Sequence, residues 1–124
     1  MPESVEVLEE LGVIIITSVG QITEHDLRLS RITVRKICQQ RGHTKILVDA
    51  TRQRNRLPTM AAFEHATILA RDDSFRMARH AIVASEHTEK DLYFLETVAN
   101  NRGAKVRSFP TREDALSWLV SKPS

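Results

Sequence analysis

The sequence predicts an α/β domain with a mixed sheet of about five strands and four helices. Residues 45–51 form a short stretch that is apolar on both faces and carries a carboxylate near its carboxyl end, as a buried strand does. Amphipathic segments precede and follow it, and this alternation of strand and helix continues to the end of the chain. Because a parallel neighbour is reached only through a crossover, strands that alternate with helices are expected to pair in parallel.

Two strands and a helix are expected before this central strand. Residues 5–8 are a weak strand candidate, whereas residues 13–19 are rich in β-branched side chains and are a strong one. The short turn between them predicts an antiparallel pair. Thr23 is expected to open a long helix, with Asp26 in the capping-box position, and Gly42 is expected to close it.

A loop and a second helix are expected directly after the central strand. Residues 51–57 are rich in arginine and are predicted to be a loop, and residues 58–71 are predicted to be a helix with proline in its first turn. The residues expected on the inner face of this helix are Met60, Phe63, Ala66, Thr67 and Ala70.

The remaining third of the sequence predicts two more strands and two more helices. Strands are expected at residues 79–85 and 105–109, each with an apolar centre. Thr88 is expected to cap the helix between them, and Thr111 the helix that follows the last strand.

Composition limits the domain count and the chemistry. A chain of 124 residues with 41% hydrophobic and 27% charged residues is expected to form one domain, residues 1–124. The single cysteine, Cys38, excludes an intrachain disulfide and a cysteine-rich metal site, and neither a metal nor a cofactor is expected. No apolar run approaches the roughly 20 residues that span a bilayer. We expect a cytoplasmic protein.

Basic residues concentrate between Arg28 and Arg56. This stretch holds nine Lys or Arg residues and one acid, Asp49, so it carries +8, while the rest of the chain carries −6. Basic surfaces attract phosphates, membranes or acidic proteins. Five of the nine lie on one predicted helix, where a solvated outer face is the simpler interpretation.

Three stretches of the sequence resemble one known family. Residues 45–51 (Lys-Ile-Leu-Val-Asp-Ala-Thr), residues 79–85 (Arg-His-Ala-Ile-Val-Ala-Ser) and the strand and helix within residues 106–119 are similar to the SpoIIAA-like (STAS/SEC14-related) family of small bacterial α/β proteins. The resemblance implies a right-handed βα superhelix with a mixed sheet. It also implies a regulatory or ligand-binding role in place of catalysis.

The sequence departs from that family where the helix after the central strand begins. Anti-sigma-factor antagonists of this fold carry an Asp-Ser-Ser-Gly-like motif there, and its serine is phosphorylated. Residues 55–60 read Asn-Arg-Leu-Pro-Thr-Met instead, so Thr59 is the one hydroxyl left as a candidate phosphoacceptor. A helix N-terminus favours a phosphate electrostatically, but the motif of the switch itself is not present.

The carboxyl edge of the sheet is the expected place for a small-ligand site, because ligands of open α/β sheets bind outside that edge. The residues expected to gather there are Asp49, Thr51, Arg52, Ser85, Glu86, His87 and Thr111. The alternative is that they only end strands and cap helices.

An anion site is a second prediction near this edge. Arg52, Arg54 and Arg56 alternate, so an extended backbone would place three guanidinium groups on one side, suited to phosphate or carboxylate. In a flexible loop the alternation has no meaning. Nucleic acid is an unlikely partner, because no aromatic residue is interleaved with these arginines.

No enzyme is predicted, because the five histidines are scattered and no catalytic motif is present. Two hypotheses remain: a regulatory module that binds another protein or itself, which we favour, and a protein that binds or senses a small anionic or lipid ligand. A closed apolar cavity between sheet and helices would support the second, and a fully packed interior with an apolar patch outside would support the first. Leu29 and Ile32 lie off the core face of the first helix and predict a homodimer interface.

Overall fold

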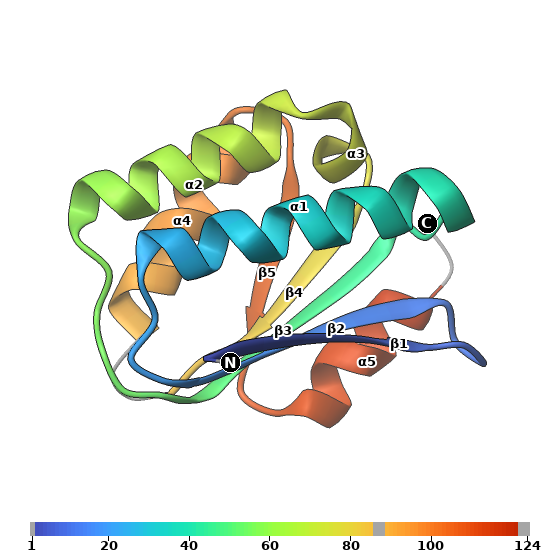
Figure 1. Cartoon of the computed structure of the whole chain (residues 1–124), viewed down its shortest axis with the longest axis horizontal. Coiled ribbons are helices and arrows are strands. Elements are labelled where there is room, and N and C mark those ends of the chain that lie inside the picture. The colour runs from blue at the N-terminus through green and yellow to red at the C-terminus, as the bar shows by residue number, and fades with distance from the viewer. Residues whose placement is uncertain (1, 86–88, 122–124) are drawn as a thin grey trace.

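A computed structural model describes residues 2–85 and 89–121 of the chain (Figure 1). The elements in order are β1 (Glu3–Leu8), β2 (Val13–Gly20), α1 (Glu24–Arg41), β3 (Lys45–Gln53), α2 (Thr59–Arg71), α3 (Asp73–Arg76), β4 (Arg79–Val83), α4 (Glu89–Asn101), β5 (Lys105–Phe109) and α5 (Arg112–Val120). The predicted α/β class and the mixed five-stranded sheet are confirmed. The prediction of four helices was one short, because the four-residue helix α3 follows α2 directly.

The five strands lie side by side in sequence order. β1 and β2 are antiparallel, as the short turn predicts, and all pairs from β2 to β5 are parallel. β1 begins at Glu3, earlier than predicted, because Glu3 pairs with Ser18. β3 continues to Gln53, since β2 supplies pairing partners up to Gly20. The first three residues of the predicted loop 51–57 are therefore strand.

Helices cover the two faces of the sheet unequally (Figure 1). α1, α2, α3 and α4 pack on one face, and α5 packs on the other, against β3, β4 and β5. Neighbouring residues of β3 show the division, because Ile46 joins the larger core and Leu47 the smaller one. Because successive side chains of a strand point to opposite faces of the sheet, one strand contributes residues to both cores.

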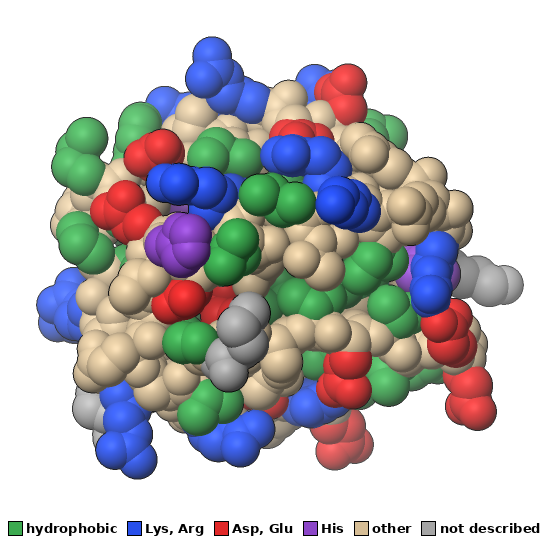
Figure 2. Space-filling view, in the orientation of Figure 1, with side chains coloured by type: hydrophobic (Ala, Val, Ile, Leu, Met, Phe, Trp, Pro, Cys, Tyr) green, Lys and Arg blue, Asp and Glu red, His purple; other side chains and the backbone are tan. Residues whose placement is uncertain are grey.

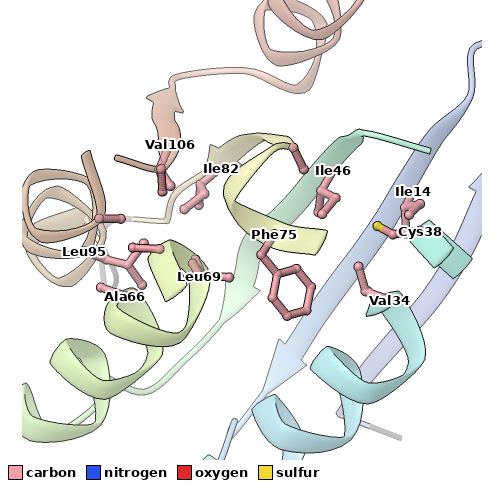
Figure 3. Close-up of a cluster of buried hydrophobic side chains, with 14 residues drawn as sticks. Ile14, Val34, Cys38, Ile46, Ala66, Leu69, Phe75, Ile82, Leu95 and Val106 are labelled. Carbon is pink, nitrogen blue, oxygen red and sulfur yellow. The ribbon is translucent and has the colours of Figure 1, made fainter. Parts of the chain in front are cut away.

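Phe75 fills the middle of the larger core. It projects from α3 between Leu69 of α2 and Val34 of α1 (Figure 3). The short helix α3 is formed because Asp72 caps it, accepting a hydrogen bond from the backbone N–H of Ser74.

The inner face of α2 differs from the prediction. Ala66 and Ala70 are buried as expected, but Met60 is 76% exposed and Phe63 is 37% exposed. The residues of α2 that are buried besides these two alanines are Ala61, Ala62 and Leu69. The helix packs against α4 as well as the sheet, so its alanines turn inward, where small side chains permit close approach.

Within the described residues, no helix is both long and apolar enough to cross a membrane. The helix termini follow their predicted caps where these are described. Thr23 and Asp26 form the reciprocal capping box of α1, and Gly42 closes the helix with a φ of 70°. Thr111 accepts a hydrogen bond from the backbone N–H of Asp114 and caps α5. Thr88 lies outside the described residues.

Replacing Leu47 with alanine tests this architecture. The side chain is fully buried beneath α5, so Leu47→Ala is expected to lower the free energy of unfolding by ~2–5 kcal/mol. Chemical denaturation measures the change, and Leu29→Ala, the same truncation at a site that is 39% exposed, is the control. Equal losses in the two variants would mean that β3 is not buried on this face.

Candidate ligand-binding site

A partly open cavity of about 60 Å³ lies between the sheet and the larger helical layer. Its wall is formed by side chains of α1, α2 and α3 and by those of the first four strands. Eight of the thirteen lining residues are apolar, and the polar ones are Glu3, Ser30, Arg31, His65 and His80. The lining is therefore mostly apolar, with a few polar groups among the apolar side chains.

Glu3 connects the edge strand to the first helix. Its side chain is buried and accepts hydrogen bonds from Ser18 Oγ at 2.6 Å and from Ser30 Oγ at 2.7 Å. Burial raises the pKa of the Glu3 carboxyl, and the two hydroxyl donors oppose that rise. The carboxyl group therefore joins β1, β2 and α1 at the cavity wall.

Arg31 and His65 join α1 to α2. Arg31 Nη1 donates to His65 Nδ1 at 2.8 Å. Because a guanidinium group only donates, Nδ1 must be the unprotonated nitrogen of a neutral ring, and His65 Nε2 carries the hydrogen. Burial, together with the electrostatic effects of Arg31 and His80, lowers the pKa of His65 to about 3. His65 Nε2–H has no hydrogen-bond partner among the described residues.

His80 presents an acceptor in the same region. The residue is 3% exposed, and its Nε2 lies 2.7 Å from the carbonyl oxygen of Phe75. Since a carbonyl only accepts, Nε2 carries the hydrogen and Nδ1 is left as an acceptor. Burial lowers the pKa of His80 to about 4, so the ring is neutral at neutral pH. No described residue donates to Nδ1.

The predicted carboxyl-edge site is brought together only in part. Asp49 Oδ1 accepts from the backbone N–H of Thr51 at 3.0 Å and from its hydroxyl at 2.6 Å, and Arg112 Nη1 lies 3.7 Å from Asp49 Oδ2. These bonds are what the end of a strand next to a helix requires. Ser85 Oγ donates to the backbone carbonyl of Gln53 at 3.3 Å. Glu86 and His87 lie outside the described residues.

The three alternating arginines begin in the sheet and continue past it. Arg52 pairs with Val19 at the end of β3, and the backbone N–H of Arg54 donates to the carbonyl of Gly20 at 2.8 Å. Arg56 follows beyond the strand. The side chains of all three are exposed. An anion site formed by this set stays a prediction.

The remaining predicted residues lie on helices. Thr59 is the first residue of α2 and is exposed, and its role as a phosphoacceptor stays a prediction. Leu29 and Ile32 are 39% and 41% exposed on α1, off its core face as expected. Figure 2 shows basic side chains gathered over α1 with hydrophobic side chains between them.

Sequence reasoning missed the polar residues of the cavity. The five histidines are scattered along the chain, and only packing brings His65 near His80. One local signal was present: Glu3, Val5 and Val7 alternate, so the strand period places Glu3 on the inward face with the two valines.

No group of three or more His, Cys, Asp or Glu residues that could hold a metal ion occurs in the part of the chain that the structure describes. The charged groups at the cavity are one carboxyl and one guanidinium. The arrangement is suited to binding an organic molecule.

Comparisons with known proteins concern the fold. A family model described as SpoIIAA-like matches residues 13–120. No curated protein matches the chain. A crystal structure of an uncharacterized protein of the DUF3478 family from Shewanella loihica, with a SpoIIAA-like fold, is similar at 20% identity and a TM-score of 0.62. The match covers 94% of this chain and 91% of that chain.

Acid destabilisation through His80 is expected. Its pKa is lowered from 6.5 to about 4 on folding, so between these pH values the unfolded chain binds more protons and stability falls as pH falls. The loss is up to about 3 kcal/mol. His80→Gln keeps a donor for Phe75 but does not titrate, so its unfolding free energy should fall less between pH 6.5 and 4.

Denaturation at a series of pH values measures this difference. The contributions of His65 and Glu3, which have opposite signs, are present in both proteins and cancel in the comparison. His25→Gln, the same substitution at an exposed position of α1, is the control. Parallel curves for His80→Gln and wild type would show that His80 is not buried as a neutral ring.

Proposed function

The chain belongs to the SpoIIAA-like family, and we propose that it is a non-catalytic domain that binds a small ligand in its interior cavity. The single observation that carries this proposal is an apolar cavity of about 60 Å³ lined by two neutral histidines and an arginine. A cavity between sheet and helices supports ligand binding over the protein-interaction role that the sequence alone favoured.

Open hydrogen-bonding capacity at the cavity supports the proposal. Among the described residues, no group pairs with His80 Nδ1 or with His65 Nε2–H, and neither atom is fully enclosed by protein. Both rings line the cavity. A bound molecule with one acceptor and one donor would satisfy both groups, and such convergent polar groups in an apolar pocket orient a ligand.

The hydroxyl and thiol groups of the described residues support binding without catalysis. No hydroxyl or thiol of the described residues is hydrogen-bonded to a described histidine, so no activated nucleophile lies at the cavity. Cys38 is buried in the larger core, and burial raises the pKa of its thiol, which disfavours the reactive thiolate.

Self-association is a second candidate role, supported by the free edge of the sheet. β1 is an edge strand, and a groove of about 280 Å³ lies between it and α1, lined in part by Val5, Leu29 and Thr33. The opposite edge is protected, because the Asn100 side chain bonds both backbone groups of Val106 in β5 at 2.8 Å. A second copy of the chain therefore fits best along β1 and α1.

Filling the cavity tests the ligand-binding role. Native mass spectrometry of protein purified from its own host is expected to show a noncovalent additional mass. Val34 lines the cavity and is 1% exposed, so Val34→Phe should occupy the space and remove that mass. Ile32→Phe, on the exposed side of the same helix, should retain it. A wild-type protein without additional mass, or a Val34→Phe protein that keeps it, would contradict the role.

The dimer is tested by charging the exposed face of α1. Light scattering at micromolar concentration should report a mass near twice the 14.1 kDa chain for wild type and one chain for Leu29→Glu with Ile32→Glu. Two carboxylates would be desolvated in the interface, which costs several kcal/mol. An exposed pair on two other helices, Met60→Glu on α2 with Tyr93→Glu on α4, is the control. A wild-type monomer refutes self-association, and an unchanged dimer places the interface elsewhere.

A further inference from the structure

We propose that the cavity takes a small monocarboxylate, with a chain of about two to four carbons, whose carboxylate group replaces His65 as the partner of Arg31. The inference rests on the proposed function, because it names the ligand class of the same cavity. Three features carry it: the volume of the cavity, the lack of a direct ion pair between Arg31 and a described carboxylate, and a surface pocket that shares lining residues with the cavity.

The volume limits the ligand to a few atoms. One water-sized group needs about 10–15 Å³ of such space. A cavity of about 60 Å³ therefore has room for roughly four to six such groups at most, and it is less than half the size of the cavity of about 150 Å³ that holds the six carbons of benzene. Acetate and propionate, with four and five non-hydrogen atoms, fall within this limit, and butyrate, with six, is its upper bound.

The lining requires a carbon chain with one polar end. The apolar wall includes Ile16, Ile46 and Ile82 of three neighbouring strands and Leu69 and Phe75 of the helical layer. Inorganic phosphate would leave these side chains against a strongly hydrated ion, which is unfavourable. A short alkyl chain would instead bury its own apolar surface against them.

Arg31 forms no direct ion pair with a described carboxylate. Its guanidinium group is partly buried, and the carboxylates of Glu64 and Glu3 stabilise its charge without contacting it directly. Its one hydrogen bond goes to the neutral ring of His65, which leaves further N–H donors of the guanidinium unused. A carboxylate matches the planar fork of arginine and would pair the charge, which a neutral ligand cannot do.

The other polar groups complete the recognition. Once a carboxylate replaces it as the partner of Arg31, His65 still presents Nε2–H as a donor to the anion. His80 Nδ1 only accepts, so a carboxylate ligand reaches it through a bridging water. Glu3 also faces the cavity, from β1, and the pKa of its carboxyl is raised by burial.

A surface pocket of about 40 Å³ provides an entrance between α1 and α2. Leu27, Arg31 and His65 line both this pocket and the interior cavity. The 2.8 Å bond from Arg31 to His65 therefore lies between residues that the two pockets share. Glu24 and Glu64 also line the smaller pocket, and a carboxylate that enters through it replaces His65 as the partner of Arg31.

Titration of the whole protein with propionate and with 1-propanol tests the class of ligand. The two molecules have similar size, but only propionate has a charge at neutral pH. We expect saturable NMR shifts of the Ile16, Ile46 and Ile82 methyl groups with propionate, and binding of 1-propanol weaker by about tenfold or more. Val34→Phe should abolish the shifts caused by propionate.

Variants of two arginines on α1 separate a direct contact from the general field of the helix. Arg31→Gln should weaken the binding of propionate by about tenfold or more. Arg31→Lys keeps the charge but loses the planar guanidinium group, so it should weaken the binding of propionate less. Arg28→Gln removes the same charge at a residue that lines only the surface pocket and should change binding less than about threefold. Thermal unfolding checks that every variant is folded.

The outcomes distinguish this inference from the proposed function. Binding of 1-propanol as tight as that of propionate would overturn the carboxylate class and leave the small-ligand role intact. The carboxylate class is also overturned, and the small-ligand role kept, by a second result. In that result propionate causes no NMR shifts, while the native protein carries an additional noncovalent mass that Val34→Phe removes. Equal losses for Arg31→Gln and Arg28→Gln would overturn the contact with Arg31. Propionate shifts that persist in Val34→Phe would place the site outside the cavity and overturn the inference.

Discussion

Each strand of the sheet lies next to the one that precedes it in the sequence, always on the same side, and the rest of the structure depends on this order. β2, β3, β4 and β5 are parallel and lie in sequence order, so each connection is a crossover in the same direction. Crossovers between parallel strands are right-handed, and connections of one hand in one direction all place their helices on the same face. α1, α2, α3 and α4 therefore share one layer, and only α5, which follows the last strand, is free to cover the other face (Figure 1).

This crowded layer accounts for both the core and the cavity. α1 packs against β1, whereas α2 packs against α4 at the other end of the sheet. Phe75 of α3 lies between α1 and α2 (Figure 3). The polar pair Arg31 and His65 joins the same two helices. Because the two helices are each held by a different neighbour, the space over the middle strands is incompletely filled. Glu3 then holds β1 to α1 through Ser30 at one side of that space.

The absence of a reversal in strand order explains why the carboxyl edge is not a deep crevice. Ligands of open α/β sheets bind where the strand order changes direction, and this sheet has no such change. Asp49 and Thr51 bond to each other there, and Thr111 caps α5. The cavity lies instead beneath the helices, with its polar groups supplied by an edge strand, two helices and the start of β4.

The sequence by itself determined the features that depend on near neighbours along the chain: the alternation of strands and helices, the capping box at Thr23, and the antiparallel start of the sheet. It located α2 correctly but assigned its inner face wrongly, because residues 59–70 are apolar on several sides and periodicity cannot choose among them. Only the tertiary structure decided the cavity. Arg31 and His65 are 34 residues apart, and their bond exists because α1 and α2 are laid side by side by the sheet. Patterns among neighbouring residues carry no information on which residues far apart in the sequence come into contact.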